Sequence, residues 1–189
     1  MKKVLTSAVM AMLACAGARA QELLIPHDYT ETSPQELHLY EQNVLDCVEW
    51  LVNTPVDEQS ADRQNVRKFV LEWIQATPNV AVYLDPQLME FTQDSKYTDE
   101  MLTVYAGGYL SGLLRDKDTH GDLTLSGEAT TKGETKADRI KGVTSAIETS
   151  LEFYDKNKDK LGRNNTLEKY KEMLHEGTLR EHIESNIRD

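Results

Sequence analysis

Fourteen consecutive residues without a charge, from Met101 to Leu114, constrain the fold of this chain more than any other feature. Such a run must be buried, yet it is too short to span a bilayer, which takes about 20 residues. Three glycines, Gly107, Gly108 and Gly112, lie inside it. Because each glycine within a helix costs about 1 kcal/mol relative to alanine, we expect neighbouring helices to approach the backbone there. The run therefore predicts a central, buried helix.

Apolar residues at helical spacing predict further helices on both sides of this run. The first begins at Ser33-Pro34, where Glu36 completes a capping box, and it ends near Asn53, before Thr54-Pro55. The other predicted helices cover residues 58–76, 85–91, 136–158, 166–175 and a terminal stretch around 179–183. The side chains expected in the core include Trp50, Phe69, Trp73, Tyr105, Leu151, Leu167, Tyr170 and Leu174.

Two segments depart from the helical pattern. Residues 80–84 are five apolar residues, which form either a buried strand or the start of a helix. A polar loop covers residues 116–136, and Leu123 and Leu125 alternate within it as in a short hairpin. The sequence predicts an all-α fold: an irregular bundle of about five to seven helices with, at most, one short strand or hairpin.

Residues 1–20 have the layout of a bacterial export signal. Lys2-Lys3 is followed by an apolar run, and Ala18-Arg19-Ala20 suits cleavage before Gln21. The alternative is a lipoprotein anchored through Cys15; a permanent membrane helix would need a longer apolar run. Cleavage would leave an irregular lead-in at residues 21–32 and a single domain at 33–189, which we expect to be periplasmic or extracellular.

The formal charge limits which partners we expect, and the cysteine content limits which disulfides can form. Loss of Lys2, Lys3 and Arg19 with the signal changes the formal charge from −11 to −14. An acidic surface repels nucleic acid and anionic membranes, so we expect no nucleic-acid partner. Cys47 would then be the single remaining cysteine, which cannot form an internal disulfide. Its position on the apolar side of a helix indicates a buried structural thiol.

One loop has the spacing of a metal site. From Asp116 onward the chain resembles the EF-hand calcium loop, with acidic residues at positions 1 and 3 and Gly121 at position 6. It departs from that family at position 5, which is His120, and at position 12, where glycine precedes the glutamate. The candidate calcium ligands are Asp116, Asp118, Asp122 and Glu128. A solvated acidic loop is the competing interpretation.

The chain has no strong catalytic or cofactor motif. His175 and His182 lack the four-residue spacing that a helical zinc-protease site requires. The leading hypothesis is therefore a non-enzymatic exported protein that binds an envelope protein or has a structural accessory role. Two alternatives are a small-ligand or calcium-binding module using residues 116–128, and a hydrolase with dispersed acidic residues.

Overall fold

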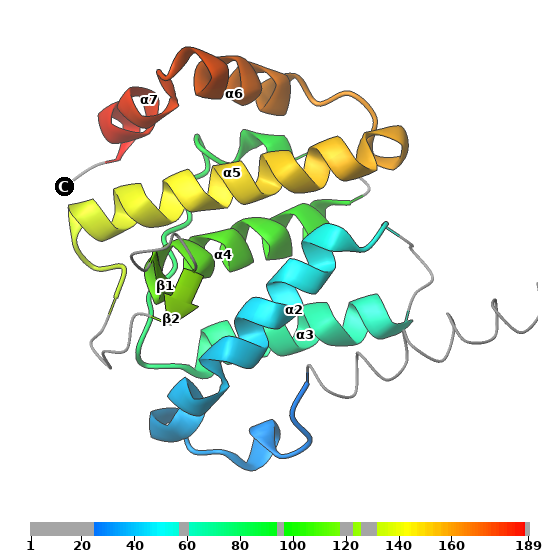
Figure 1. Cartoon of the computed structure of the whole chain (residues 1–189), viewed down its shortest axis with the longest axis vertical. Helices are drawn as coiled ribbons and strands as arrows, with labels where there is room; N and C mark the ends of the chain where they lie inside the picture. Colours follow the sequence, from blue (N-terminus) through cyan, green and yellow to red (C-terminus); the bar gives the residue numbers. More distant parts are fainter. Residues whose placement is uncertain (1–24, 57–60, 94–96, 118–122, 126–131, 188–189) are drawn as a thin grey trace, which may run out of the picture.

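Helix α4 (Thr98–Leu114) lies at the centre of the fold, as its charge-free sequence predicted (Figure 1). Twelve of its seventeen residues are buried, and its exposed residues are Thr98 and Asp99 in its first turn. Helix α5 (Lys136–Leu161) packs along α4, and α2 (Glu41–Asn53) contacts both of them. This computed structural model describes residues 25–56, 61–93, 97–117, 123–125 and 132–187.

The described residues form an all-α bundle with six α-helices and one short hairpin, which confirms the predicted fold class. Helices α6 and α7 lie on the side of α5 away from α4, whereas α2 and α3 lie on the other side of α4 (Figure 1). The remaining elements, in chain order, are η1 (Tyr29–Glu31), η2 (Pro34–Tyr40), α3 (Ala61–Ala76), η3 (Glu90–Thr92), β1 (Arg115–Lys117), β2 (Leu123–Leu125), α6 (Asn165–Glu176) and α7 (Leu179–Asn186).

The glycines of α4 are the points where its neighbours approach most closely. A Cβ atom at Gly107 would lie 2.5 Å from a methyl of Val48 on α2. At Gly112 it would lie 2.6 Å from the Cβ of Ser145 on α5, and Gly108 faces the same helix. Because real Cβ atoms do not approach so closely, only glycine permits these helix spacings. The predicted reason for the glycines, close approach of neighbouring helices, is confirmed.

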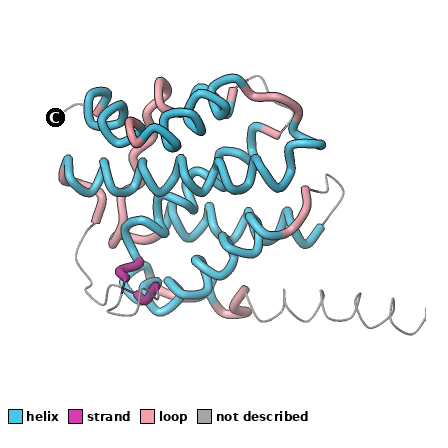
Figure 2. The backbone as a smooth tube through the Cα atoms, turned by 45° about the horizontal axis from the view of Figure 1, so that its top comes forward, coloured by secondary structure: helices cyan, strands magenta, loops and turns pink. Residues whose placement is uncertain are grey.

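The hairpin predicted around Leu123 and Leu125 is also present. Strand β1 leaves the end of α4 directly and pairs antiparallel with β2, with Asp116 opposite Thr124 (Figure 2). Residues 80–84 form neither of the predicted elements. They are extended and make one isolated bridge, in which the amide of Ala81 donates to the carbonyl of Lys132 at 2.8 Å.

The first helix begins differently from the prediction. Residues Pro34–Tyr40 form a 3₁₀ helix, and the α-helix starts at Glu41. The Ser33 hydroxyl donates to the Glu36 carboxylate at 2.6 Å and makes no capping bond to the backbone. The two side chains of the expected capping box therefore bond to each other. Similarly, the helix predicted over 85–91 is a turn capped by the Asp85 carboxylate, followed by η3.

The C-terminal helices follow the predicted pattern with one correction. Helix α6 docks through Leu167 and Tyr170, but Leu174 is 44% exposed, so its predicted burial was wrong. The buried stripe instead continues to Met173, because α7 turns back beyond Gly177 and covers α5 itself. Of the predicted core aromatics, Trp50 is half-buried whereas Phe69, Trp73 and Tyr105 are fully buried.

Candidate functional site

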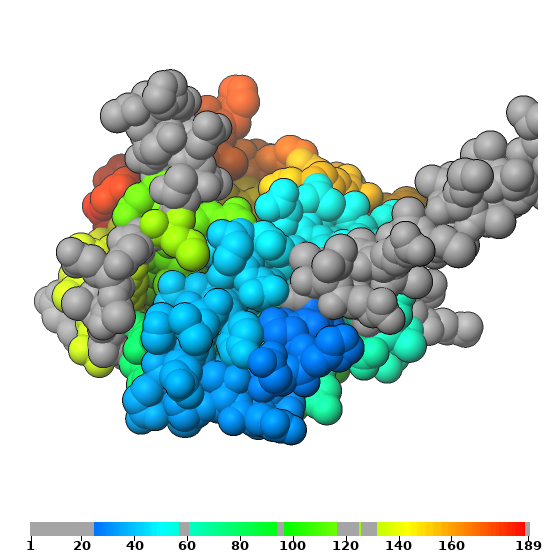
Figure 3. Space-filling view, turned by 60° about the horizontal axis from the view of Figure 1, so that its bottom comes forward, coloured from blue at the N-terminus to red at the C-terminus, as the bar shows by residue number. Residues whose placement is uncertain are grey.

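A groove of about 690 Å³ lies between α2 and α5, and α4 forms its floor. Helix α4 runs antiparallel to α5, since Gly108 faces Thr149 whereas Gly112 faces Ser145. Figure 3 shows η2 and α2 spread across one face of the molecule, and of these two elements α2 lines the groove. The volume lies within the range of about 300–1,000 Å³ that small-molecule sites occupy.

Both walls of the groove carry exposed polar side chains. Helix α2 lines it with Leu45, Val48 and Val52, which are at most 4% exposed, and with Glu49 and Asn53, which are exposed. Helix α5 contributes Ser145, Thr149 and other polar side chains, whose spacing of three or four residues places them on one helical face. A ligand in the groove would therefore meet exposed polar side chains of both helices.

Several hydroxyl groups in the groove have no hydrogen-bond partner. The Thr144 hydroxyl donates to the Ile140 carbonyl of its own helix at 2.7 Å and is thereby satisfied. By contrast, the hydroxyls of Ser111, Ser145 and Thr149 make no hydrogen bond to any residue that the structure describes. These half-exposed side chains can bond to water or to a ligand.

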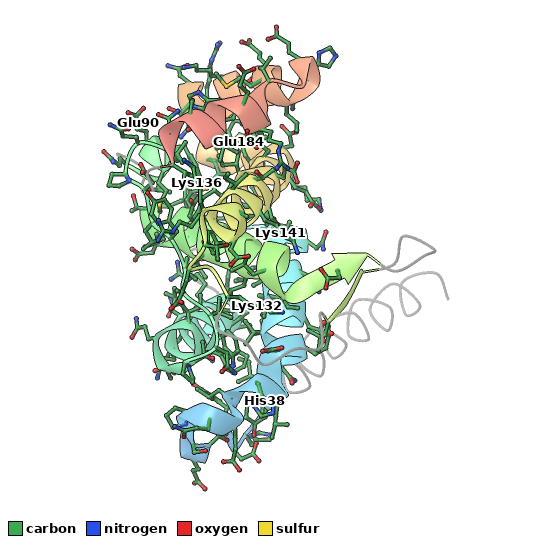
Figure 4. All side chains as sticks on the ribbon, turned by 90° about the vertical axis from the view of Figure 1, so that its left-hand side faces the viewer. His38, Glu90, Lys132, Lys136, Lys141 and Glu184 are labelled. Atoms are coloured by element: carbon green, nitrogen blue, oxygen red, sulfur yellow. The ribbon has the colours of Figure 1, made fainter. Side chains whose placement is uncertain are left out.

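The cations at the rim are already paired. Arg115 lies 3.6 Å from the Glu49 carboxylate, which links β1 to α2. Lys141 lies 3.3 Å from the Asp116 carboxylate, where α5 passes the start of the hairpin (Figure 4). The exposed carboxylate of Glu148 on α5 has no ion-pair partner within the described part of the chain. The unpaired charge in the groove is therefore negative.

Of the four candidate calcium ligands, Asp116 lies among the residues that the structure describes. Asp116 lies in β1, is exposed and forms the ion pair with Lys141. Asp118, Asp122 and Glu128 lie outside the described residues. Among the residues that are described, no three potential metal ligands come together. The calcium site stays a prediction.

The two C-terminal histidines are not brought together. His175 is exposed, and His182 is half-buried with its ring 5.8 Å from the ring of Tyr170. Burial lowers the pKa of His182, and nearby Lys169 lowers it further. No hydrogen bond or ion pair connects a carboxylate to either ring within the described ranges. The hydrolase hypothesis therefore has no assembled site among these residues.

The environment of Cys47 fits the interpretation of a structural thiol. Its side chain is fully buried in α2, and burial raises its pKa to about 12. The reactive species of cysteine is the thiolate, which is negligible at neutral pH for such a group. Cys47 therefore contributes to packing.

A buried ion pair was missed by the sequence reasoning. Arg63 on α3 is 2% exposed, and its Nε donates to the Glu100 carboxylate of α4 at 2.6 Å. Its Nη atoms donate to the carbonyls of Leu51 and Thr54 at 2.7 and 2.9 Å, which lie at the C-terminal end of α2. Each of the three guanidinium nitrogens thus donates a hydrogen bond to the protein. We therefore assign this cluster a structural role.

The fold and the groove define this chain as an all-α helical protein with an open groove between two helices. Comparison with protein-family models, curated proteins and solved structures found no match. None of the described helices has both the length and the apolar character needed to cross a membrane. The functional argument therefore depends on the groove itself. Sequence reasoning missed it because a row of Ser, Thr and Glu on a helix has the pattern of an ordinary solvated face.

Proposed function

We propose that this chain is an exported, non-enzymatic protein of the cell envelope that binds a partner in the groove between α2 and α5. The observation that carries the proposal is the groove, in which the hydroxyls of Ser111, Ser145 and Thr149 have no hydrogen-bond partner among the described residues. A concave site of this volume with a few convergent polar groups is typical of binding. The export layout of residues 1–20 supports a location outside the cytoplasm.

Binding fits the lining better than catalysis. A serine or threonine hydroxyl becomes a nucleophile when a general base lies within hydrogen-bond reach. None of the groove hydroxyls has such a base in the described residues, and no histidine lines the groove. The groove therefore offers hydrogen-bonding positions without an activated nucleophile.

Site-specific crosslinking in cells tests this function. A photo-crosslinking amino acid at Ser111, on the groove floor, is expected to capture a defined envelope protein. The same group at Glu172, on the exposed side of α6, is the control and should not capture it. Purified partner should then bind the wild type and fail to bind a Ser111→Phe variant that retains its melting temperature. Equal capture from both positions, or equal binding by Ser111→Phe, would remove the groove from the function.

A further inference from the structure

A strap of residues 25–36, which contains η1 and the start of η2, lies on the surface of the bundle. None of its residues is buried, and Ile25 and Tyr29 are side chains of the strap that pack partly against the core. The next residue, Leu37, is 3% exposed, and its carbonyl accepts a hydrogen bond from the indole of Trp73 on α3 at 2.9 Å. The strap is therefore firmly anchored at its C-terminal end.

Tyr29 fastens the other end of the strap to α3. Its ring meets the ring of Phe69 edge-on, with 4.7 Å between the centroids, and Phe69 is fully buried. Its hydroxyl donates to the Glu72 carboxylate at 2.6 Å. Burial, with a further contribution from Glu72, raises the pKa of Tyr29 to about 12, so the phenol keeps the proton that it donates at neutral pH. One side chain thus supplies an aromatic contact and a polar contact.

Release of Tyr29 would leave no buried charge without a partner. The side chain of Glu72 is 43% exposed and its carboxylate lies 3.7 Å from Lys68, so it keeps both water and a cation. A second tie, from the Tyr40 hydroxyl to the Asp28 carboxylate at 3.1 Å, is exposed to solvent. Segments with few buried apolar contacts and exposed hydrogen bonds open at a free energy well below that of global unfolding.

We propose that the strap opens and closes as a unit about Leu37, with Tyr29 as its latch, while the helices beneath it stay folded. In the open form the side of the Phe69 ring that Tyr29 covers faces solvent, next to the Glu72 carboxylate. The strap therefore controls access to this aromatic face of α3. No strap residue lines the groove between α2 and α5, so this device is independent of the proposed binding function.

Limited proteolysis of the full chain with a glutamate-specific protease measures the opening. Glu31 lies in η1, and cleavage after it requires the extended backbone that an open strap provides. When opening is fast relative to cleavage, the rate follows the open population. We expect cleavage after Glu31 in the native protein, identified by mass spectrometry and slower than in an unfolded peptide of the same sequence. Its rate should rise with urea far less steeply than global unfolding does.

Two matched variants isolate the latch. Tyr29→Phe keeps the ring and loses the hydroxyl, so it should speed cleavage after Glu31 about ten-fold, since hydrogen bonds to charged groups are the stronger ones. Tyr154→Phe is the control, because it also loses a tyrosine hydroxyl that donates to a glutamate, Glu168, at 2.7 Å, but between α5 and α6. It should leave cleavage after Glu31 unchanged.

The opposite results would overturn the proposal. Cleavage after Glu31 that occurs only with global unfolding, with the same dependence on urea, would show that the strap does not open separately. Cleavage as fast as in the unfolded peptide would show that the strap is not closed. No effect of Tyr29→Phe, or an equal effect of Tyr154→Phe, would show that Tyr29 is not the latch.

Discussion

The buried pair of Arg63 and Glu100 permits a quantitative prediction about stability. We consider Arg63→Met, which keeps much of the aliphatic volume and removes the charge. The variant loses three hydrogen bonds of 2.6–2.9 Å to Glu100, Leu51 and Thr54. It also leaves Glu100, 5% exposed, with Arg67 as its remaining described ion-pair partner at 3.1 Å.

The expected loss is about 3–5 kcal/mol of unfolding free energy, because removing Arg63 leaves the buried Glu100 carboxylate compensated by the partly exposed Arg67 alone. That is a large fraction of the roughly 5–15 kcal/mol that stabilises a typical domain. Urea unfolding followed by far-ultraviolet circular dichroism measures it. The exposed pair of Arg180 and Glu184 is the control, and Arg180→Met should cost less than about 1 kcal/mol.

The double variant Arg63→Met/Glu100→Leu tests the reasoning directly. Removing both charges eliminates the buried carboxylate that Arg67 alone would compensate, so the double variant should be less destabilised than the sum of the two single variants. A cost below about 1 kcal/mol for Arg63→Met would refute the argument. Additive losses in the double variant would show that the two side chains are not energetically coupled.

Five further predictions concern four individual side chains and the loop at residues 116–128. The hydroxyl of Tyr105 is buried without a hydrogen-bond partner among the described residues, so Tyr105→Phe should leave thermal stability equal or higher. Tyr170→Phe, which loses a bond to the Leu88 carbonyl, should cost about 1 kcal/mol. Because the folded-state pKa of His182 is lowered, the unfolded chain binds more protons near pH 6, and stability should fall as the pH decreases from 7 to 5. His182→Gln should remove part of that fall in pH-dependent urea titrations. Cys47, with a pKa raised to about 12, should resist alkylation at pH 8 until the protein unfolds, and early reaction would contradict its burial. The melting temperature should be the same in calcium and in chelator if residues 116–128 are a solvated loop, whereas an increase with calcium would establish the predicted site.

The main helices could be predicted because their signals are local. Each of these signals depends on neighbouring residues alone. They are the charge-free run of α4, the apolar spacing of α5 and the glycine at the C-terminal cap of α6, Gly177. The buried thiol of Cys47 followed from the same periodicity. The predicted start of the first helix was less accurate. The Ser33 hydroxyl bonds to the Glu36 carboxylate, and neither side chain caps the helix backbone as the capping box predicted.

The interactions between distant segments could not be predicted in this way. Arg63 looks like a surface residue of α3, and its burial depends on Glu100, 37 residues away. Asn157 lies in the last turn of the helix predicted over 136–158, yet it is 2% exposed and its side-chain oxygen accepts from the amide of Val56 at 2.8 Å. The groove depends in the same way on how α2 and α5 are placed relative to α4.

The side chains of α5 that face α4 indicate that packing alone does not explain the groove. The close contacts at Gly108 and Gly112 require small residues on α5, and alanine would satisfy that requirement with a better helix propensity than serine or threonine. Ser145 and Thr149 add hydroxyls that bond to no described residue and line the groove. Threonine is moreover restricted in its rotamers within a helix. These two residues therefore supply hydroxyls beyond what the packing requires, and they are the groups that the proposed binding function would use.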